Sequence, residues 1–369
     1  MNRRTFLWKA AQAGVLLRLA SANLFAKQAD PIPPALVESY RKWLVIDALA
    51  GINLDDLPIK QQVLQQALDS GVTGINWTVS TPDYESTVDA ISFVEGLVES
   101  EPTHFMVVRQ QEDLEQTKQK NKIGIILGFQ HPQPIEPDLK RIATFRRLGV
   151  RVMQLTYNKR GAYGDGCLEP ANAGLSKAGH AAVARMNALG VAVDLSHCGQ
   201  RTTAEGIEAS SKPVVITHAG CSAVHKHPRN KDDRELRAMA DRGGVVGIYF
   251  MPYLVASPTP PTRQHVIEHL DHALKVCGTE HVGIGSDGVL DSFPDTVEQR
   301  KAFAADMANR KKLGIAAPEE DRPPFSPDLN TPQRMEIVAA GLQKKGYSEE
   351  VIENVMGKNF YRVFGEIWS

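Results

Sequence analysis

Short apolar runs recur along the chain, and each is followed by a stretch whose apolar residues are spaced as on one face of a helix. The runs are rich in Val and Ile, which is typical of strands buried on both faces of a parallel sheet. Eight of them can be counted, at residues 43–49, 71–80, 123–130, 150–158, 191–197, 213–218, 245–250 and 281–287. This alternation predicts an α/β fold in which the sheet closes into a (β/α)8 TIM barrel, rather than an open doubly wound sheet.

The remaining segments extend this barrel without suggesting a second domain. A short additional strand is predicted at residues 104–110. Residues 289–330 are rich in Pro and charged residues and predict a lid or surface excursion. Two helices are expected at 331–346 and 348–364. We therefore expect residues 30–369 to form a single β/α-barrel domain with C-terminal helices.

Residues 1–26 have the pattern of a twin-arginine signal segment. Arg3 and Arg4 precede an apolar run from Ala10 to Ala22 that is too short to serve as a stable membrane anchor. This pattern predicts recognition by the Tat export machinery and a periplasmic or exported location. The alternative is an amphipathic N-terminal helix with no targeting role.

Composition narrows the classes of partner. The chain has 369 residues, 42% hydrophobic and 23% charged, with a formal net charge of -1. These values suit one large globular domain, and no basic stripe indicates a nucleic-acid partner. The four cysteines lack C-x-x-C spacing, so no zinc ribbon is indicated. Whether the protein forms a homodimer stays open.

Three of the apolar runs end in residues that can bind metal or transfer protons. His197 ends the fifth run, His218 the sixth and Asp287 the eighth. Because side chains at the C-terminal ends of barrel strands converge on one pocket, these residues predict a hydrolytic metal site. The two imidazoles can bind zinc, and the carboxylate can act as general base or orient the attacking water. The alternatives are packed histidines and a strand-end cap.

Other candidates lie at neighbouring strand ends. Arg229, in the loop after the sixth run, can hold a substrate carboxylate through a bidentate contact. Tyr157 and Asn158 end the fourth run and Gln130 ends the third, where their side chains can donate hydrogen bonds to an oxyanion. His131 is equally compatible with a loop residue and a ligand.

Five motifs together resemble the membrane dipeptidase (renal dipeptidase-like) family, whose members are zinc-dependent barrel hydrolases. They are D-L-S-H-C (194–198), I-T-H-A-G (216–220), H-P-R-N-K (227–231), G-I-G-S-D-G (283–288) and V-M-G-K-N-F-Y-R-V (355–363). The resemblance implies a metal-dependent hydrolase type of TIM barrel. It also implies that His197 and His218 bind one zinc, that Arg229 reads the substrate carboxylate and that Asp287 lies beside the scissile amide.

The sequence departs from the family pattern at the other half of the metal site. Leu49 and Gly51 stand where the family has an H-x-D pair after the first strand. Gln130 stands where the family has a bridging Glu, and Tyr157 where it has a catalytic His. Since two dications need several anionic or imidazole ligands, we expect one Zn²⁺ ion rather than two.

The resulting expectation is a dipeptidase-like metallohydrolase that cleaves a dipeptide or similar small amide carrying a free carboxylate. Asp287 and Tyr157 are the expected catalytic residues, and Arg229, Asn158 and Gln130 are expected to bind substrate. Two alternatives remain: lyase, isomerase or deaminase-type chemistry on the same barrel, and a non-catalytic binding or maturation protein.

Overall fold

The computed structural model describes residues 31–54, 56–136 and 138–369. The signal segment predicted at 1–26 lies outside the described residues, so export stays a prediction. Within the described part of the chain, no helix combines the length and the apolar character that crossing a bilayer requires.

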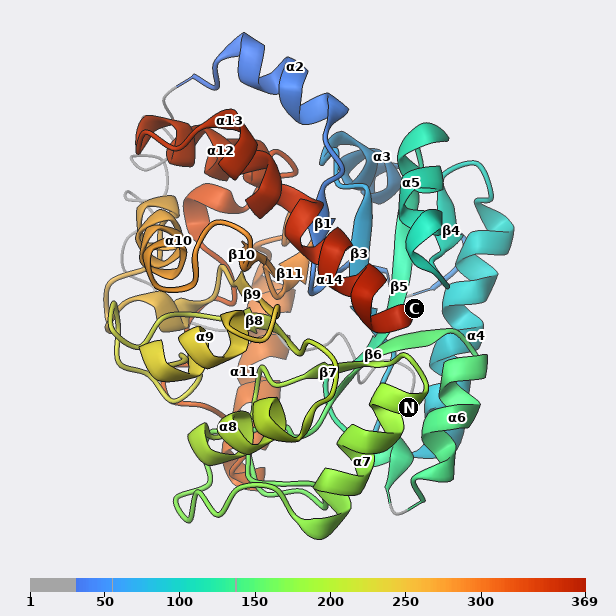
Figure 1. Cartoon of the computed structure of the whole chain (residues 1–369). Helices are drawn as coiled ribbons and strands as arrows, with labels where there is room; N and C mark the ends of the chain where they lie inside the picture. The colour runs from blue at the N-terminus through green and yellow to red at the C-terminus, as the bar shows by residue number, and fades with distance from the viewer. Residues whose placement is uncertain (1–30, 55, 137) are drawn as a thin grey trace.

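Eight parallel strands close into a barrel, as the alternating pattern predicts (Figure 1). The order around the barrel is β3-β1-β10-β9-β8-β7-β6-β5, and β5 pairs back with β3. The strands are β1 (Ile46–Asp47), β3 (Gly74–Thr78), β5 (Ile123–Phe129), β6 (Val150–Gln154), β7 (Ala192–Asp194), β8 (Val215–Ala219), β9 (Val245–Ile248) and β10 (Val282–Ile284). Nearly all of their residues are buried, which explains the continuous apolar runs.

Three short strands add to the barrel. The predicted additional strand is confirmed as β4 (Phe105–Val107), which pairs with the first residues of β5 while β6 pairs with its last. Beyond the barrel, β2 (Ala50–Gly51) and β11 (Gly288–Val289) form a separate parallel pair. Since β2 follows β1 and β11 follows β10, this pair joins the two chain segments that leave neighbouring barrel strands.

Helices surround the barrel (Figure 1). Those between the strands are α3 (Gln61–Asp69), α4 (Tyr84–Ser100), α5 (Gln111–Gln119), α6 (Lys140–Arg147), α7 (Lys177–Ala188), α8 (Gln200–Ala209), α9 (Asp233–Ala240) and α10 (Arg263–Cys277). Single-turn 3-10 segments lie at Gln133–Ile135, Pro252–Leu254 and Pro327–Leu329. The helices bury one apolar face each. In α7, for example, Ala182, Val183 and Met186 point inward and Ser176 caps the first turn.

The chain ends close one end of the barrel. Helix α2 (Pro34–Lys42) precedes β1, and the C-terminal elements are α12 (Arg334–Lys344), α13 (Glu349–Glu353), a π-helical turn (Asn354–Lys358) and α14 (Asn359–Trp368). Five apolar residues of α14, Trp368 among them, pack in one cluster with Val152 of β6 and with the first residues of β7, β8 and β9. Because α14 covers the strand starts, the strand C-termini on the opposite end are left for chemistry.

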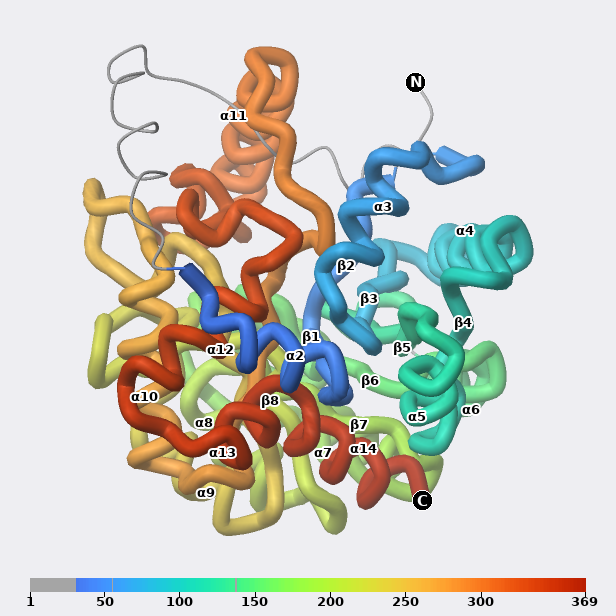
Figure 2. Tube along the Cα trace, turned by 90° about the horizontal axis from the view of Figure 1, so that it is seen from above, coloured from blue at the N-terminus to red at the C-terminus, as the bar shows by residue number. Residues whose placement is uncertain are grey.

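The segment between β11 and α12 differs from the sequence expectation. It contains a 17-residue helix, α11 (Val297–Leu313), where the sequence predicted only a lid or surface excursion. Only Phe303 and Met307 of this helix are buried. With no continuous apolar stripe, the sequence lacked the signal that marks an amphipathic helix. Figure 2 shows α11 standing out from the barrel.

Candidate active site

Two imidazoles meet at the C-terminal ends of adjacent barrel strands. His197 lies three residues after β7, and His218 lies within β8, its hydrogen-bonded neighbour. Their ring centroids are 5.0 Å apart with an interplanar angle of 63°. Both side chains are buried. The predicted convergence of these two residues is therefore present in the fold.

Hydrogen bonding fixes the tautomer of His197. Its Nδ1 lies 2.6 Å from the Oδ1 of Asn158. The Asn158 amide is oriented by its own Nδ2, which donates to the carbonyl of Ile315 at 2.8 Å. An amide oxygen only accepts, so the proton of His197 is on Nδ1 and the Nε2 lone pair is free. That Nε2 is buried and has no hydrogen-bond partner.

A chain of hydrogen bonds fixes the tautomer of His218 in the same way. The hydroxyl of Thr217 donates to the Asp194 carboxylate at 2.6 Å, so its oxygen is left to accept from the Nδ1 of His218 at 2.8 Å. Asp194 also accepts from the hydroxyl of Ser196. The Nε2 of His218 is again buried without a partner. A carboxylate behind a ligating histidine is the usual support of metal sites, here relayed through a hydroxyl.

Both imidazoles are neutral. Burial lowers the pKa of His197 and of His218 well below the usual value, and the nearby Arg229 guanidinium lowers both further. Neutral imidazole is the form that binds a metal ion, because the lone pair is then available.

The site offers few side chains that could hold a metal ion. The two unpartnered Nε2 atoms supply two ligands. Among the residues that the structure describes, no group of three or more His, Cys, Asp or Glu side chains could hold a metal ion. Leu49, which follows β1, and Gly51, in β2, are buried and carry no ligating atom in their side chains. A two-metal site needs more charged or imidazole ligands than these elements offer.

Arg229 lies beside the histidines with an unused donor. It is buried in the loop after β8, and its Nη1 donates to the carbonyl of Ser196 at 2.8 Å. Its guanidinium lies 5.8 Å from the ring centroid of Tyr249. The Nη2 atom is buried and has no partner. An unsatisfied buried guanidinium donor is costly unless a ligand completes it, so this atom suits an anionic group of a substrate.

Asp287 follows β10, and hydrogen bonds to Asp47 of β1 and to Leu49 hold this segment. Its N–H donates to the carbonyl of Leu49 at 2.8 Å, and the Asp47 carboxylate accepts from the N–H of Leu49 and of Ser286. Asp287 has a φ of 56°, in the left-handed region. Two residues earlier, position 285 requires glycine, because a Cβ there would lie 1.8 Å from the carbonyl oxygen of Thr217.

The Asp287 carboxyl is poised to exchange a proton near neutral pH. Desolvation raises its pKa to about 6, against the opposing effects of the Arg229 cation and of a hydrogen bond from Gln130. The Gln130 Nε2 donates to its Oδ1 at 3.3 Å. Gln130 and Asp287 therefore lie together at the site, and both are half-buried, whereas the histidines and Arg229 are fully enclosed.

Tyr157 covers the ring of His197. The two rings stack with centroids 4.3 Å apart and an angle of 22°. The Tyr157 hydroxyl accepts from the Nη2 of Arg310 at 3.0 Å. Burial raises its pKa, although Arg310 lowers it, so the phenol is protonated. His131 lies edge-on to Tyr157 at 6.4 Å between centroids, and burial lowers its pKa to about 4.

Sequence reasoning missed several residues of this site. Asp194 and Thr217 orient His218, and their only sequence signal is that polar residues interrupt buried strands. Arg310 comes from α11 and carried no signal at all. Asn158 was predicted to bind substrate, and the structure places its amide between His197 and Ile315, with both ends bonded to protein.

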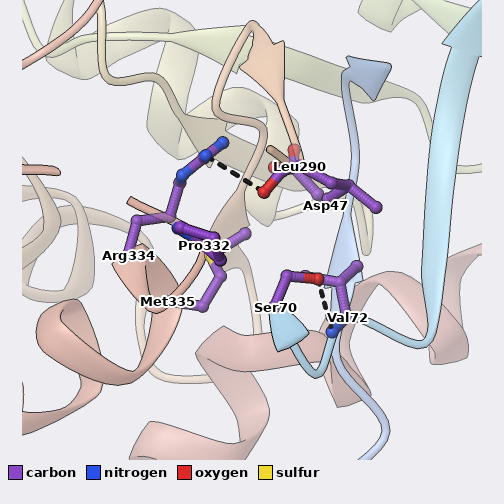
Figure 3. A pocket seen from close by; sticks show the side chains of 7 residues that line it. All are labelled: Asp47, Ser70, Val72, Leu290, Pro332, Arg334 and Met335. Atoms are coloured by element: carbon purple, nitrogen blue, oxygen red, sulfur yellow. Dashed lines mark hydrogen bonds between the residues drawn. The ribbon is translucent and has the colours of Figure 1, made fainter. Parts of the chain in front are cut away.

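Two cavities lie elsewhere on the molecule. One lies beside β1, where Arg334 donates to the carbonyl of Leu290 (Figure 3). It is lined by Asp47, Ser70, Val72, Leu290, Pro332, Arg334 and Met335. Asp47, which lines it, also accepts a hydrogen bond from the N–H of Ser286, the residue before Asp287. The other cavity lies between residues 31–33, α10 and α12.

The closed barrel and the paired imidazoles at its C-terminal end define a barrel of the hydrolase type. A sequence profile of the membrane dipeptidase family (peptidase family M19) matches residues 35–317. The chain belongs to this family, whose members are metal-dependent peptidases.

Individual relatives agree with this assignment. Dipeptidase verJ from Clonostachys rogersoniana is 27% identical over 349 residues, covering 89% of this chain and 81% of that protein. Dipeptidase tcpJ from Claviceps purpurea is 25% identical over 284 residues, covering 76% of this chain and 60% of its own length. The chain thus spans less than two thirds of the second relative. A crystal structure of an amidohydrolase from Pseudomonas aeruginosa superposes with a TM-score of 0.80 at 29% identity, covering 90% of this chain and 99% of that chain.

Proposed function

We propose that the protein is a dipeptidase-like hydrolase that cleaves a dipeptide or similar small amide and uses a single divalent metal ion, with zinc as the expected ion. One observation carries the proposal. The Nε2 atoms of His197 and His218 are buried, deprotonated and without partners in adjacent strands, next to an equally unpartnered donor on Arg229. Three unsatisfied polar atoms in one buried place are costly, and a metal ion with an anionic substrate would satisfy all of them.

The residues take complementary roles. Arg229 binds the free carboxylate of the substrate through Nη2 and thereby fixes the position of the amide. Asp287, on the accessible side of the site, removes a proton from the attacking water. Tyr157 donates a hydrogen bond to the oxygen of the amide carbonyl as it becomes negative. A divalent ion at the two imidazoles supplies Lewis-acid activation.

The proposed substrate follows from the size and charge of this arrangement. Arg229 is a fully enclosed cation, so it favours a substrate whose carboxylate can reach it from the half-buried side where Asp287, Gln130 and Tyr157 lie. A free carboxylate one residue from the scissile amide meets this requirement, as in a dipeptide. An additional residue on the C-terminal side of the scissile amide would place the carboxylate too far from that amide.

Hydrolysis of a dipeptide panel by zinc-loaded protein tests the proposal. We expect turnover of dipeptides and none of the same dipeptides with an amidated C-terminus. His197→Ala should abolish turnover and lower zinc binding to background. His225→Ala is a matched control, because His225 lies in the loop after β8 but its side chain contacts Glu319 and His227 instead of the site. Full activity of His197→Ala would exclude the single-metal mechanism.

One observation favours a second candidate function. The acid–base pair of Asp287 and Tyr157 is complete, whereas the set of metal ligands is reduced to two. Proton transfer in a lyase, isomerase or deaminase-type reaction would use this pair without a second ion. Activity that persists after chelation and that is lost in both Asp287→Asn and Tyr157→Phe would favour this candidate.

We further propose that the twin-arginine pattern at residues 1–26 directs export to the periplasm. Fusion of this segment to a reporter that is active only after export, with Arg3→Lys and Arg4→Lys together as the control, tests this independently of the enzymatic proposal.

A further inference from the structure

We propose that Arg310 is a positioning residue that aims and polarises the hydroxyl of Tyr157 toward the oxyanion formed during amide cleavage. This inference rests on the proposed hydrolase function and deepens it. It gives α11, which lies outside the motifs at the strand ends, a part in the chemistry that acts through Tyr157.

The geometry of the pair determines where the Tyr157 proton points. The Nη2 of Arg310 lies 3.0 Å from the Tyr157 oxygen, and its guanidinium carbon lies 5.6 Å from the ring centroid. A guanidinium carries only donors, so the hydroxyl must accept from it. The single proton of the phenol is then free to be donated away from Arg310. Stacking on His197 fixes the ring, and the proton lies near the plane of this ring, so its direction is fixed as well.

Arg310 is itself held in place by an ion pair. Its Nη2 also bonds to the Oε1 of Glu320, and the other oxygen of Glu320 accepts from the N–H of Ala317 at 2.6 Å. The side chains of Arg310 and Glu320 are 17% and 13% exposed, so water screens this pair only weakly. Glu320 is thus fully used by protein, which leaves Arg310 as the group that acts on Tyr157.

Charge explains why this site needs such a cation. Leu49, Gly51 and Gln130 stand where the family pattern places metal ligands. Tyr157 stands where it places a catalytic His, and all four residues are neutral. A second ion would supply positive charge near the amide oxygen. A guanidinium hydrogen-bonded to the phenol stabilises the partial negative charge that the phenol oxygen gains while it donates to an oxyanion. No proton leaves Tyr157 in this arrangement.

If the role of Arg310 were purely structural, this side chain would be needed to hold α11 at the site. The end of α11 is tied to the site by two other bonds, from the Nδ2 of Asn158 to the carbonyl of Ile315 at 2.8 Å and from the Nζ of Lys159 to the carbonyl of Leu313 at 3.2 Å. These bonds hold the segment near Tyr157 without Arg310. Arg310 is therefore not needed merely to keep α11 in place.

A double-mutant cycle separates the two roles. Arg310→Met should lower kcat about tenfold to hundredfold while KM changes by less than about threefold, because the contact stabilises the transition state more than the bound substrate. In a Tyr157→Phe background, the same change should lower kcat by less than about twofold. An equal loss in both backgrounds would overturn the proposal, and so would no loss in either.

Two further variants control for folding and charge. Lys311→Met removes the next cation on the same helix, which pairs with Asp321 in an exposed position, and should leave kcat unchanged. Arg310→Lys keeps the positive charge and should restore part of the lost kcat. Each variant is compared with the wild type by thermal melting. A loss in Lys311→Met equal to that in Arg310→Met would overturn the proposal, since it would mark a general effect of the helix.

Failure of the proposed function can be told apart from failure of this inference. If the wild type cleaves no dipeptide, the hydrolase proposal fails, and binding of a phosphinate analogue of a dipeptide is measured by calorimetry instead. Its tetrahedral anionic centre carries the charge that Tyr157 is proposed to meet. Arg310→Met should weaken binding about tenfold or more relative to Lys311→Met. Equal affinities of these two variants would overturn the role of Arg310.

Discussion

The hydroxyl oxygen of Thr217 lies 2.8 Å from the Nδ1 of its chain neighbour His218, and its proton is donated to the Asp194 carboxylate. This relationship decides which nitrogen of His218 is free. The Thr217 hydroxyl uses its one proton in the hydrogen bond to Asp194, so its oxygen can only accept from His218. His218 must therefore donate through Nδ1 and present the Nε2 lone pair to the site. A buried carboxylate thus controls the tautomer of an imidazole that it does not contact.

Removing this hydroxyl should weaken metal binding. In Thr217→Val the Nδ1 of His218 loses its acceptor, so the ring can exchange tautomers and rotate. We expect zinc affinity to fall about tenfold to hundredfold, as for other supports of metal-binding histidines. Calorimetric zinc titration at one fixed pH measures the change. Thr217→Ser keeps the hydroxyl and should bind nearly as the wild type does. If the valine variant binds zinc as tightly as the serine variant, the hydroxyl has no such role.

The pKa of Asp287 predicts the acid limb of the pH profile. A general base works only when deprotonated, and desolvation raises the pKa of this carboxyl to about 6. We therefore expect kcat/KM to rise with pH through a midpoint near 6 and then to level off. Measurement of initial rates between pH 4.5 and 8 checks this, with zinc occupancy followed separately at each pH. A flat profile across this range at constant occupancy would contradict the assignment.

The same raised pKa predicts a cost in stability. The folded state binds a proton to Asp287 more tightly than the unfolded chain does, so this group makes folding less favourable as pH rises from about 4 through 6. At pH 7, Asp287→Asn should therefore stabilise the protein by on the order of 1–2 kcal/mol, discounted because the residue is half-buried. The gain should shrink as pH falls and be nearly lost at about pH 3, below both pKa values, where both states are protonated. Denaturant unfolding at the two pH values measures it, and a variant less stable at pH 7 would speak against this charge cost.

The sequence was sufficient for the barrel because each strand is buried on both faces and flanked by an amphipathic helix. The convergence of His197 and His218 followed from the same regularity, since adjacent parallel strands end at one side of a barrel. Contacts between distant segments could not be obtained this way. Arg310 and Tyr157 are 153 residues apart, and α11 shows no periodic stripe that would place it in the fold.

The sequence also could not predict which side chains become hydrogen-bond partners or which of them donates. The D-L-S-H-C and I-T-H-A-G motifs contain Asp194 and Thr217, yet only the fold brings the carboxylate within 2.6 Å of the hydroxyl. Nor could the sequence reveal that the Asn158 amide supports His197, because the neighbouring carbonyl of Ile315 comes from the segment after α11. Each of these contacts joins elements that a linear pattern treats separately.

Restoring the missing ligands should create a second metal site. The change Leu49→His with Gly51→Asp, combined with Gln130→Glu and Tyr157→His, returns the four positions to the family pattern. Each position lies within four residues after the end of β1, β5 or β6, so we expect the new side chains to lie at the C-terminal end of the barrel. We expect bound zinc to rise from about one to about two ions per chain, because the three added metal ligands at positions 49, 51 and 130, together with His197 and His218, meet the requirement of a two-metal centre. Metal analysis after dialysis measures the ratio. Adding Arg310→Met should increase occupancy further, since the guanidinium repels a nearby dication. A ratio that stays near one in both variants, with cooperative unfolding retained, would show that ligand identity alone does not limit the site.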